Sequence, residues 1–108
     1  MSTELKQAYD HCERVTRSEA KNFYFAFRTL PRQRRRAIYA AYAFCRLCDD
    51  IADDGGPIEE KRRLFEQVRG RLHQSQNGDV PDPMFTALKH AISEFKIPPH
   101  YFELVIDG

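Results

Sequence analysis

The 108 residues predict an all-α protein. Apolar residues recur at intervals of three and four along most of the chain, which is the spacing of one helix face. No stretch sustains the alternation of apolar and polar residues that is typical of a half-buried strand. Proline and glycine divide the chain into segments of helical length. Together these observations favour a helical bundle with short connections.

Six helices are predicted from these breaks. The first begins beside Ser2 and Thr3, either of which can cap it. The second ends before Pro31, because proline disfavours helical geometry in the preceding residue and suits the first turn of the next helix. The Gly-Gly-Pro sequence at 55–57 ends the third and longest helix, and the turn residues of 75–83 predict a loop. The expected ranges are roughly 3–17, 20–29, 31–54, 57–74, 83–95 and 100–106.

Composition restricts the functional class. The net charge is only +1, so no general polyanion partner is indicated. A hydrophobic fraction of 42% argues against disorder, and no apolar run reaches the length of about 18 residues that spans a membrane. Three cysteines without a signal peptide indicate reduced thiols and a cytoplasmic protein. The apolar ending YFELVIDG suggests the N-terminal part of one longer domain.

Four carboxylates crowd the end of the third predicted helix, within CRLCDDIADDGGP at 45–57. A helix already carries partial negative charge at its C-terminal end, so this position is unfavourable unless something compensates the charge. The four residues are Asp49, Asp50, Asp53 and Asp54. Their side chains leave the helix in different directions. Asp50 is expected at the rim of the site proposed below, and Asp54 in solvent.

A helical projection places Asp49 and Asp53 on one stripe with Arg46 and the rings of Tyr42 and Tyr39, at about 100° per residue. Most of the remaining surface of this helix is apolar, which predicts an interior helix. The polar stripe is therefore expected to face a cavity rather than bulk water.

This stripe predicts a metal and diphosphate site. Two carboxylates one helical turn apart repel each other, and a hard divalent cation relieves the repulsion. Mg²⁺ is typically held by one or two carboxylates plus substrate phosphate; Asp49 and Asp53 are its expected ligands, with Mn²⁺ as a substitute. Arg46 adds a charge-assisted donor for phosphate oxygens. The residues alone leave open the alternative that these carboxylates are simply solvated, as most are.

Two stretches, KNFYFAFRTLP and RRRAIYAAYAFCRLCDDIADD, resemble the squalene/phytoene synthase family of head-to-head prenyltransferases. That family places S/N-F-x-x-x-F-x-x-L-P before Y-A-F-C-R-x-x-D-D-x-x-D, and the match runs from about Lys21 to Asp54. The resemblance implies an all-α isoprenoid-synthase fold with a central cavity. It also implies that two farnesyl or geranylgeranyl diphosphates are condensed to presqualene diphosphate, squalene or phytoene, with NADPH required only for squalene.

The resemblance also implies a role for individual residues. The first aspartate-rich motif binds the Mg²⁺ that grips the diphosphate, and the arginine before it contacts that diphosphate. Two aromatic positions line the substrate cavity, and a variable serine-rich segment leads into the F-x-x-x-F element. Asp49 and Asp53 match the aspartate-rich motif, and Arg46 matches the arginine before it. Tyr42 and Phe23 match the two aromatic positions. Ser18 and Lys21 lie in the variable serine-rich segment, and Asp50, beside the motif, is a further substrate contact.

One feature departs from the family. A second aspartate-rich motif, expected on a later helix across the cavity, has no match in these residues. We therefore expect the 108-residue chain to hold half a metal site and to be inactive alone. Neither the substrate length, C15 or C20, nor the oligomeric state follows from the sequence.

Four other interpretations compete with this one. RQRRR at 32–36 suggests nucleic-acid binding, which the near-neutral net charge and the missing recognition module disfavour, and such a cluster is common as solvated surface. Peripheral contact with an anionic membrane surface is a further alternative, because the substrates that the resemblance implies are lipidic. Cys45 and Cys48, with His11-Cys12, suggest zinc, but a second cysteine pair is missing. A non-catalytic helical interaction module that retains the fold is the remaining alternative.

Overall fold

The computed structural model describes the backbone of residues 3–78 and 82–107, and the side chains within these ranges except that of Phe23. The described residues form only helices, so the all-α prediction is confirmed for them, and each predicted helix is present with its ends shifted by at most three residues. The helices are α1 (Thr3–Glu19), α2 (Lys21–Phe27), α3 (Arg32–Ala52), α4 (Ile58–Asn77), α5 (Pro83–Phe95) and α6 (His100–Asp107).

The largest shift is at the end of α4, which runs into the predicted loop. The hydroxyl of Ser75 donates to the carbonyl of Leu72 at 2.7 Å, and the side-chain amide of Asn77 donates to that of His73 at 3.1 Å. Both side chains thus bond back to carbonyls of the preceding turn, so these polar residues are accommodated within the helix. Residues 79–81 of the predicted loop lie outside the described residues.

The start of α5 follows the sequence signals closely. Pro83 occupies its first position, where a missing N–H costs nothing. The carboxylate of Asp82 accepts a hydrogen bond from the backbone N–H of Met84 at 3.0 Å and thereby caps the helix. The α5 helix ends at Lys96, which adopts the left-handed conformation with φ of 54°.

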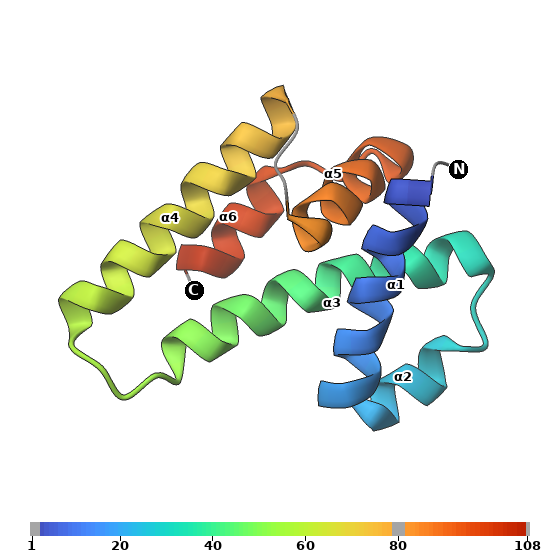
Figure 1. Cartoon of the computed structure of the whole chain (residues 1–108), viewed down its shortest axis with the longest axis horizontal. Coiled ribbons are helices and arrows are strands. Elements are labelled where there is room, and N and C mark those ends of the chain that lie inside the picture. The colour runs from blue at the N-terminus through green and yellow to red at the C-terminus, as the bar shows by residue number, and fades with distance from the viewer. Residues whose placement is uncertain (1–2, 79–81, 108) are drawn as a thin grey trace.

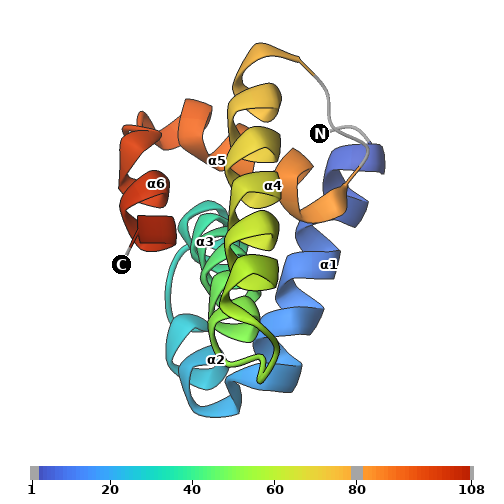
Figure 2. The same ribbon diagram turned by 90° about the vertical axis from the view of Figure 1, so that its left-hand side faces the viewer.

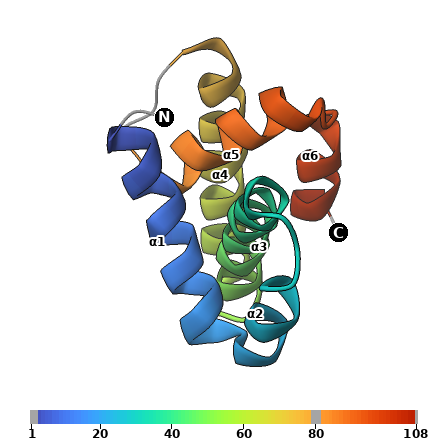
Figure 3. The ribbon, with the colours of Figure 1, turned by 90° about the vertical axis from the view of Figure 1, so that its right-hand side faces the viewer.

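The core lies where α1, α3 and α5 pack against one another. Figure 1 shows α3 running along the length of the molecule, with α1 crossing it and α2 below their junction. From one side α4 lies in front of α3 (Figure 2), and from the other α1 and α6 lie on opposite sides of it (Figure 3). Phe44 of α3 is fully buried, edge-on to Phe85 of α5 and Phe102 of α6.

No helix within the described ranges combines the length and the apolar character that crossing a membrane requires.

Candidate functional site

The last turns of α3 present the acidic sequence at the surface. Asp49 and Asp50 are exposed, and Asp53 is the residue at which the helix ends, its N–H donating to the carbonyl of Asp49 at 2.9 Å. Tyr42 is half-buried one turn before Arg46. The helix therefore carries all of the α3 residues expected in the site on three successive turns.

Arg46 joins α3 to the end of α1. Its Nε lies 3.0 Å from a carboxylate oxygen of Asp50, and its Nη2 lies 3.5 Å from one of Glu19. The charge of Asp50, followed by those of Glu19 and Tyr42, raises the pKa of the Arg46 guanidinium. In this structure the partner of Arg46 on α3 is therefore Asp50, which the helical projection assigned to the rim.

Asp49 and Asp53 differ from Asp50 in lacking a cation. Among the described residues, neither carboxylate has a lysine, arginine or histidine within ion-pair distance. The negative end of α3 is compensated instead by Lys61 of α4, whose Nζ donates to the carbonyl of Ala52 at 3.0 Å. This lysine offsets the helix dipole but leaves the two carboxylates free to bind a cation.

The surface beside Asp53 is hollowed but open, and Asp49 is not among the residues that line the hollow. An open hollow of about 360 Å³ lies between the end of α3 and α4. In the described part of the chain, the expectation that the polar stripe faces a cavity rather than bulk water is therefore wrong at its acidic end, where Asp49 and Asp53 are exposed. The residues lining the hollow are Arg46, Asp50, Ile51, Asp53, Asp54 and Leu64.

Tyr39 does not belong to the polar stripe on which the projection placed it. Its side chain is 1% exposed and stacks on the ring of Tyr24 from α2, with centroids 5.7 Å apart. Burial raises the pKa of its hydroxyl. The reason is that α2 folds back over this side of α3, a contact that the periodicity of α3 alone does not contain. Tyr42, one turn nearer the carboxylates, stays half-buried.

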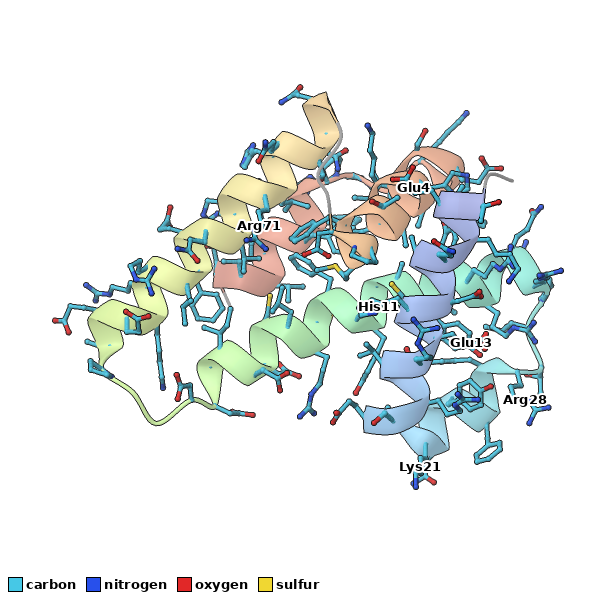
Figure 4. All side chains as sticks on the ribbon, viewed as in Figure 1. Glu4, His11, Glu13, Lys21, Arg28 and Arg71 are labelled. Atoms are coloured by element: carbon cyan, nitrogen blue, oxygen red, sulfur yellow. The ribbon has the colours of Figure 1, made fainter. Side chains whose placement is uncertain are left out.

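The junction of α1 and α2 lies beside Arg46. Ser18 is exposed in the last turn of α1, next to the Glu19 that pairs with Arg46, and Lys21 is the exposed first residue of α2. The side chain of Phe23 lies outside the described residues, so its expected place in a substrate cavity stays a prediction. Figure 4 shows Lys21 at the lower edge of the molecule, where α1 meets α2.

The cysteines are buried or half-buried thiols. Burial raises the pKa of Cys12 to about 12 and that of Cys48 to about 11. For Cys45, burial raises the pKa and the Asp49 carboxylate adds to the effect. Zinc requires thiolates, so these environments do not favour a zinc site.

The donor set at the end of α3 suits a hard cation that keeps part of its water. The described residues contain no group of three or more histidine, cysteine, aspartate or glutamate side chains arranged to hold a metal ion. A protein nevertheless usually contributes only one or two carboxylate ligands to Mg²⁺ when substrate phosphate supplies others. Two exposed carboxylates one turn apart match that number.

Comparison with known proteins points to one family. Residues 16–108 match the sequence profile described as squalene/phytoene synthase. A phytoene synthase of Mycobacterium tuberculosis is 40% identical over 98% of this chain and 34% of its own length. A presqualene diphosphate synthase of Rhodopseudomonas palustris is 36% identical over 81% of this chain and 31% of its own length. This chain thus spans about a third of these relatives.

Solved structures agree with the sequence comparison. A squalene synthase from Alicyclobacillus acidocaldarius superimposes with a TM-score of 0.87 at 29% identity, covering 99% of this chain and 40% of that one. A dehydrosqualene synthase solved in complex with ligand superimposes with a TM-score of 0.78 at 30% identity, covering 94% of this chain and 35% of that one. The helices described above are therefore arranged as in these synthases.

Proposed function

Because this chain belongs to the squalene/phytoene synthase family, we propose that the full protein condenses two isoprenyl diphosphates head to head. The substrates are farnesyl or geranylgeranyl diphosphate, and the product is presqualene diphosphate, squalene or phytoene. Residues 1–108 form the N-terminal part of the single catalytic domain. Phytoene, diapophytoene and presqualene diphosphate synthases among the relatives support this reaction class.

One observation carries the proposal: Asp49 and Asp53 lie one turn apart and have no cationic partner among the described residues, while Arg46 stands a turn earlier. The two carboxylates would hold Mg²⁺, or Mn²⁺, against the diphosphate. When bound, the metal ion supplies the positive charge that makes diphosphate a better leaving group.

The other residues act on the substrate. Arg46 donates to phosphate oxygens once it exchanges Asp50 and Glu19 for the ligand, and Lys21 and Ser18 add donors from the α1–α2 junction. Breaking the allylic C–O bond sends its electron pair to diphosphate and leaves a carbocation. The faces of Tyr42 and Phe23 would stabilise that cation in a site that excludes water. Asp50 holds Arg46 at the rim.

Cofactor and location follow from the proposed chemistry. NADPH is needed only if the product is squalene, because that product requires a reductive step. We propose a cytoplasmic enzyme in peripheral contact with a lipid surface, since both substrates and products carry long apolar chains.

Product analysis tests the proposed function. The full-length protein is incubated with each diphosphate, with Mg²⁺ and again with EDTA, and the products are separated by mass. We expect C30 or C40 condensation products only with the metal. If the full-length protein neither forms such products nor binds a farnesyl diphosphate analogue with Mg²⁺, the non-catalytic interaction module is the correct interpretation.

The purified 108-residue chain is expected to release no diphosphate from farnesyl diphosphate. It contains the D-x-x-x-D spacing only within residues 49–54, so it supplies one of the two carboxylate clusters that the proposed site needs. Mg²⁺-dependent diphosphate release, measured by a colorimetric phosphate assay after pyrophosphatase treatment, would show that this half-site is sufficient.

Removing the charge of Glu19 is expected to improve diphosphate binding. Glu19 competes with the ligand for Arg46, so Glu19→Gln should tighten binding of Mg²⁺-pyrophosphate by about two- to five-fold, the range of an exposed ion pair. Isothermal titration calorimetry of the full-length protein measures this change.

Glu4→Gln is the matched control for this change. Glu4 lies at the opposite end of α1 (Figure 4), roughly 22 Å from Glu19 along the helix axis. Its removal should leave the affinity unchanged, since charges at this distance are screened. Weaker binding by the Glu19 variant would mean that Glu19 orients Arg46 for the ligand rather than competing with it.

A further inference from the structure

Positive charge is concentrated on one segment of this nearly neutral chain. Residues 20–36 contain no acidic side chain, although the whole chain has a net charge of only +1. The segment covers α2 and the start of α3. Its basic residues are Lys21, Arg28, Arg32, Arg34, Arg35 and Arg36.

Part of this segment forms a continuous surface around an exposed ring. Phe25 is 60% exposed, and the Arg28 guanidinium lies 5.9 Å from its ring centroid. The start of α3 adjoins this pair, because Nη1 of Arg35 donates to the carbonyl of Arg28 at 3.4 Å. Arg32 precedes Arg35 by three positions and so shares its helix face. These four residues, Phe25, Arg28, Arg32 and Arg35, are called the basic–aromatic patch.

The charges of the patch are not neutralised by the protein. Within the part of the chain that the structure describes, none of Arg28, Arg32 and Arg35 is within ion-pair distance of a carboxylate. Figure 4 shows Arg28 at the outer edge of the molecule, away from α4 and α6. An exposed aromatic ring beside an arginine without an ion-pair partner, with further such arginines at the adjoining start of α3, combines the two interactions that bind a protein to an anionic bilayer, apolar insertion and attraction to headgroups.

We propose that the basic–aromatic patch docks the protein on the surface of a membrane containing anionic lipids. Phe25 enters the headgroup region while Arg28, Arg32 and Arg35 contact lipid phosphates and carboxylates. The patch includes the C-terminal end of α2, the helix that carries Lys21 and Phe23. Docking there would bring the proposed substrate-binding elements next to the bilayer in which a long-chain product dissolves.

An anionic bilayer fits the patch better than a nucleic acid does. Single-stranded nucleic acids are usually held by a basic groove with several rings on which successive bases stack, whereas this patch contains one exposed ring. The biological purpose of docking rests on the proposed function. Docking itself is measured without substrate or turnover, so each hypothesis can fail while the other stands.

Vesicle co-sedimentation tests docking. The full-length protein is mixed with phosphatidylcholine vesicles, with or without about one-third phosphatidylserine, at about 0.1 M salt. We expect binding only to the anionic vesicles. Arg28→Gln with Arg32→Gln should weaken it about 25-fold, at about five-fold for each basic residue. Phe25→Ser should weaken it about ten-fold, and this loss should persist when salt is raised, because apolar burial is not screened.

Two comparisons separate docking from other effects. Arg14→Gln with Arg62→Gln removes the same charge from exposed positions outside the patch and should weaken binding by less than about three-fold. Arg28→Lys with Arg32→Lys keeps the charge and should retain binding. Equal losses in the two glutamine pairs, equal binding to neutral vesicles, or displacement of the chain from vesicles by a single-stranded oligonucleotide would each overturn the proposal.

Discussion

Replacing Asp49 with asparagine in the full-length protein is expected to lower turnover by about a thousand-fold and to leave the fold intact. The substitution removes a negative charge from the proposed Mg²⁺ site, and losing one preorganised electrostatic contact typically costs a hundred- to a thousand-fold in rate. Asp49 is exposed and pairs with no cation among the described residues, so the amide remains solvated. Steady-state kinetics with farnesyl and geranylgeranyl diphosphate over a Mg²⁺ titration measure the effect.

Substitutions of two neighbouring aspartates distinguish the proposed role of Asp49 as a metal ligand from a general effect of net charge. Asp53→Asn should resemble Asp49→Asn and raise the Mg²⁺ concentration that gives half-maximal activity. Asp54→Asn removes the same charge two residues beyond the helix end and should leave turnover within about three-fold, as expected of a solvated carboxylate. Undiminished activity in the Asp49 variant would exclude it as a metal ligand, and equal losses in the Asp54 variant would point to the net charge alone.

Replacing Phe44 with alanine is expected to destabilise the chain by about 3–5 kcal/mol, the usual cost of deleting a buried phenylalanine ring. Phe44 is 0% exposed, and its ring centroid lies 6.3 Å from that of Phe85 and 5.3 Å from that of Phe102. These edge-on contacts join α3 to α5 and α6, so the cavity would open where three helices meet. Because folded domains are stable by only about 5–15 kcal/mol, this cost is a large share of the total.

Urea denaturation followed by circular dichroism measures this loss. Phe25→Ala is the matched control, because it deletes the same ring from a position that is 60% exposed; we expect it to cost less than about 1 kcal/mol. Similar midpoints for the two variants would mean that Phe44 does not support the core in solution.

Local signals in the sequence were sufficient to locate the helices. Proline and glycine act within a few residues of their own position, through fixed backbone angles and missing N–H groups. The breaks at Pro31 and 55–57, and the start of α5 at Pro83, therefore lie where they were predicted. Apolar periodicity likewise predicted that α3 is an interior helix, and Phe44, Cys48 and Ile51 on it are buried, since a single helix records which of its faces avoids water.

Contacts between helices were not accessible in this way. His90 looks like a surface residue in the sequence, yet its Nδ1 lies 2.7 Å from the hydroxyl of Tyr9, which joins α5 to α1. Lys61 has no signal that would direct it to the carbonyl of Ala52, and Glu19 has none that would direct it to Arg46. Each contact joins residues on different helices, so no spacing within one helix encodes it.

The acidic end of α3 shows the same division. Its residues alone determined that Asp49 and Asp53 lie one turn apart, after Arg46, at a helix end that disfavours negative charge. Arg46 and Asp50 lie four residues apart on α3, so spacing along one helix already allows them to pair. Only the tertiary structure decided that Glu19 joins this pair, that Tyr39 is covered by α2, and that Lys61 compensates the helix end. The physical reason is that spacing sets the direction in which a side chain leaves its helix, whereas its partner depends on which other helix packs there.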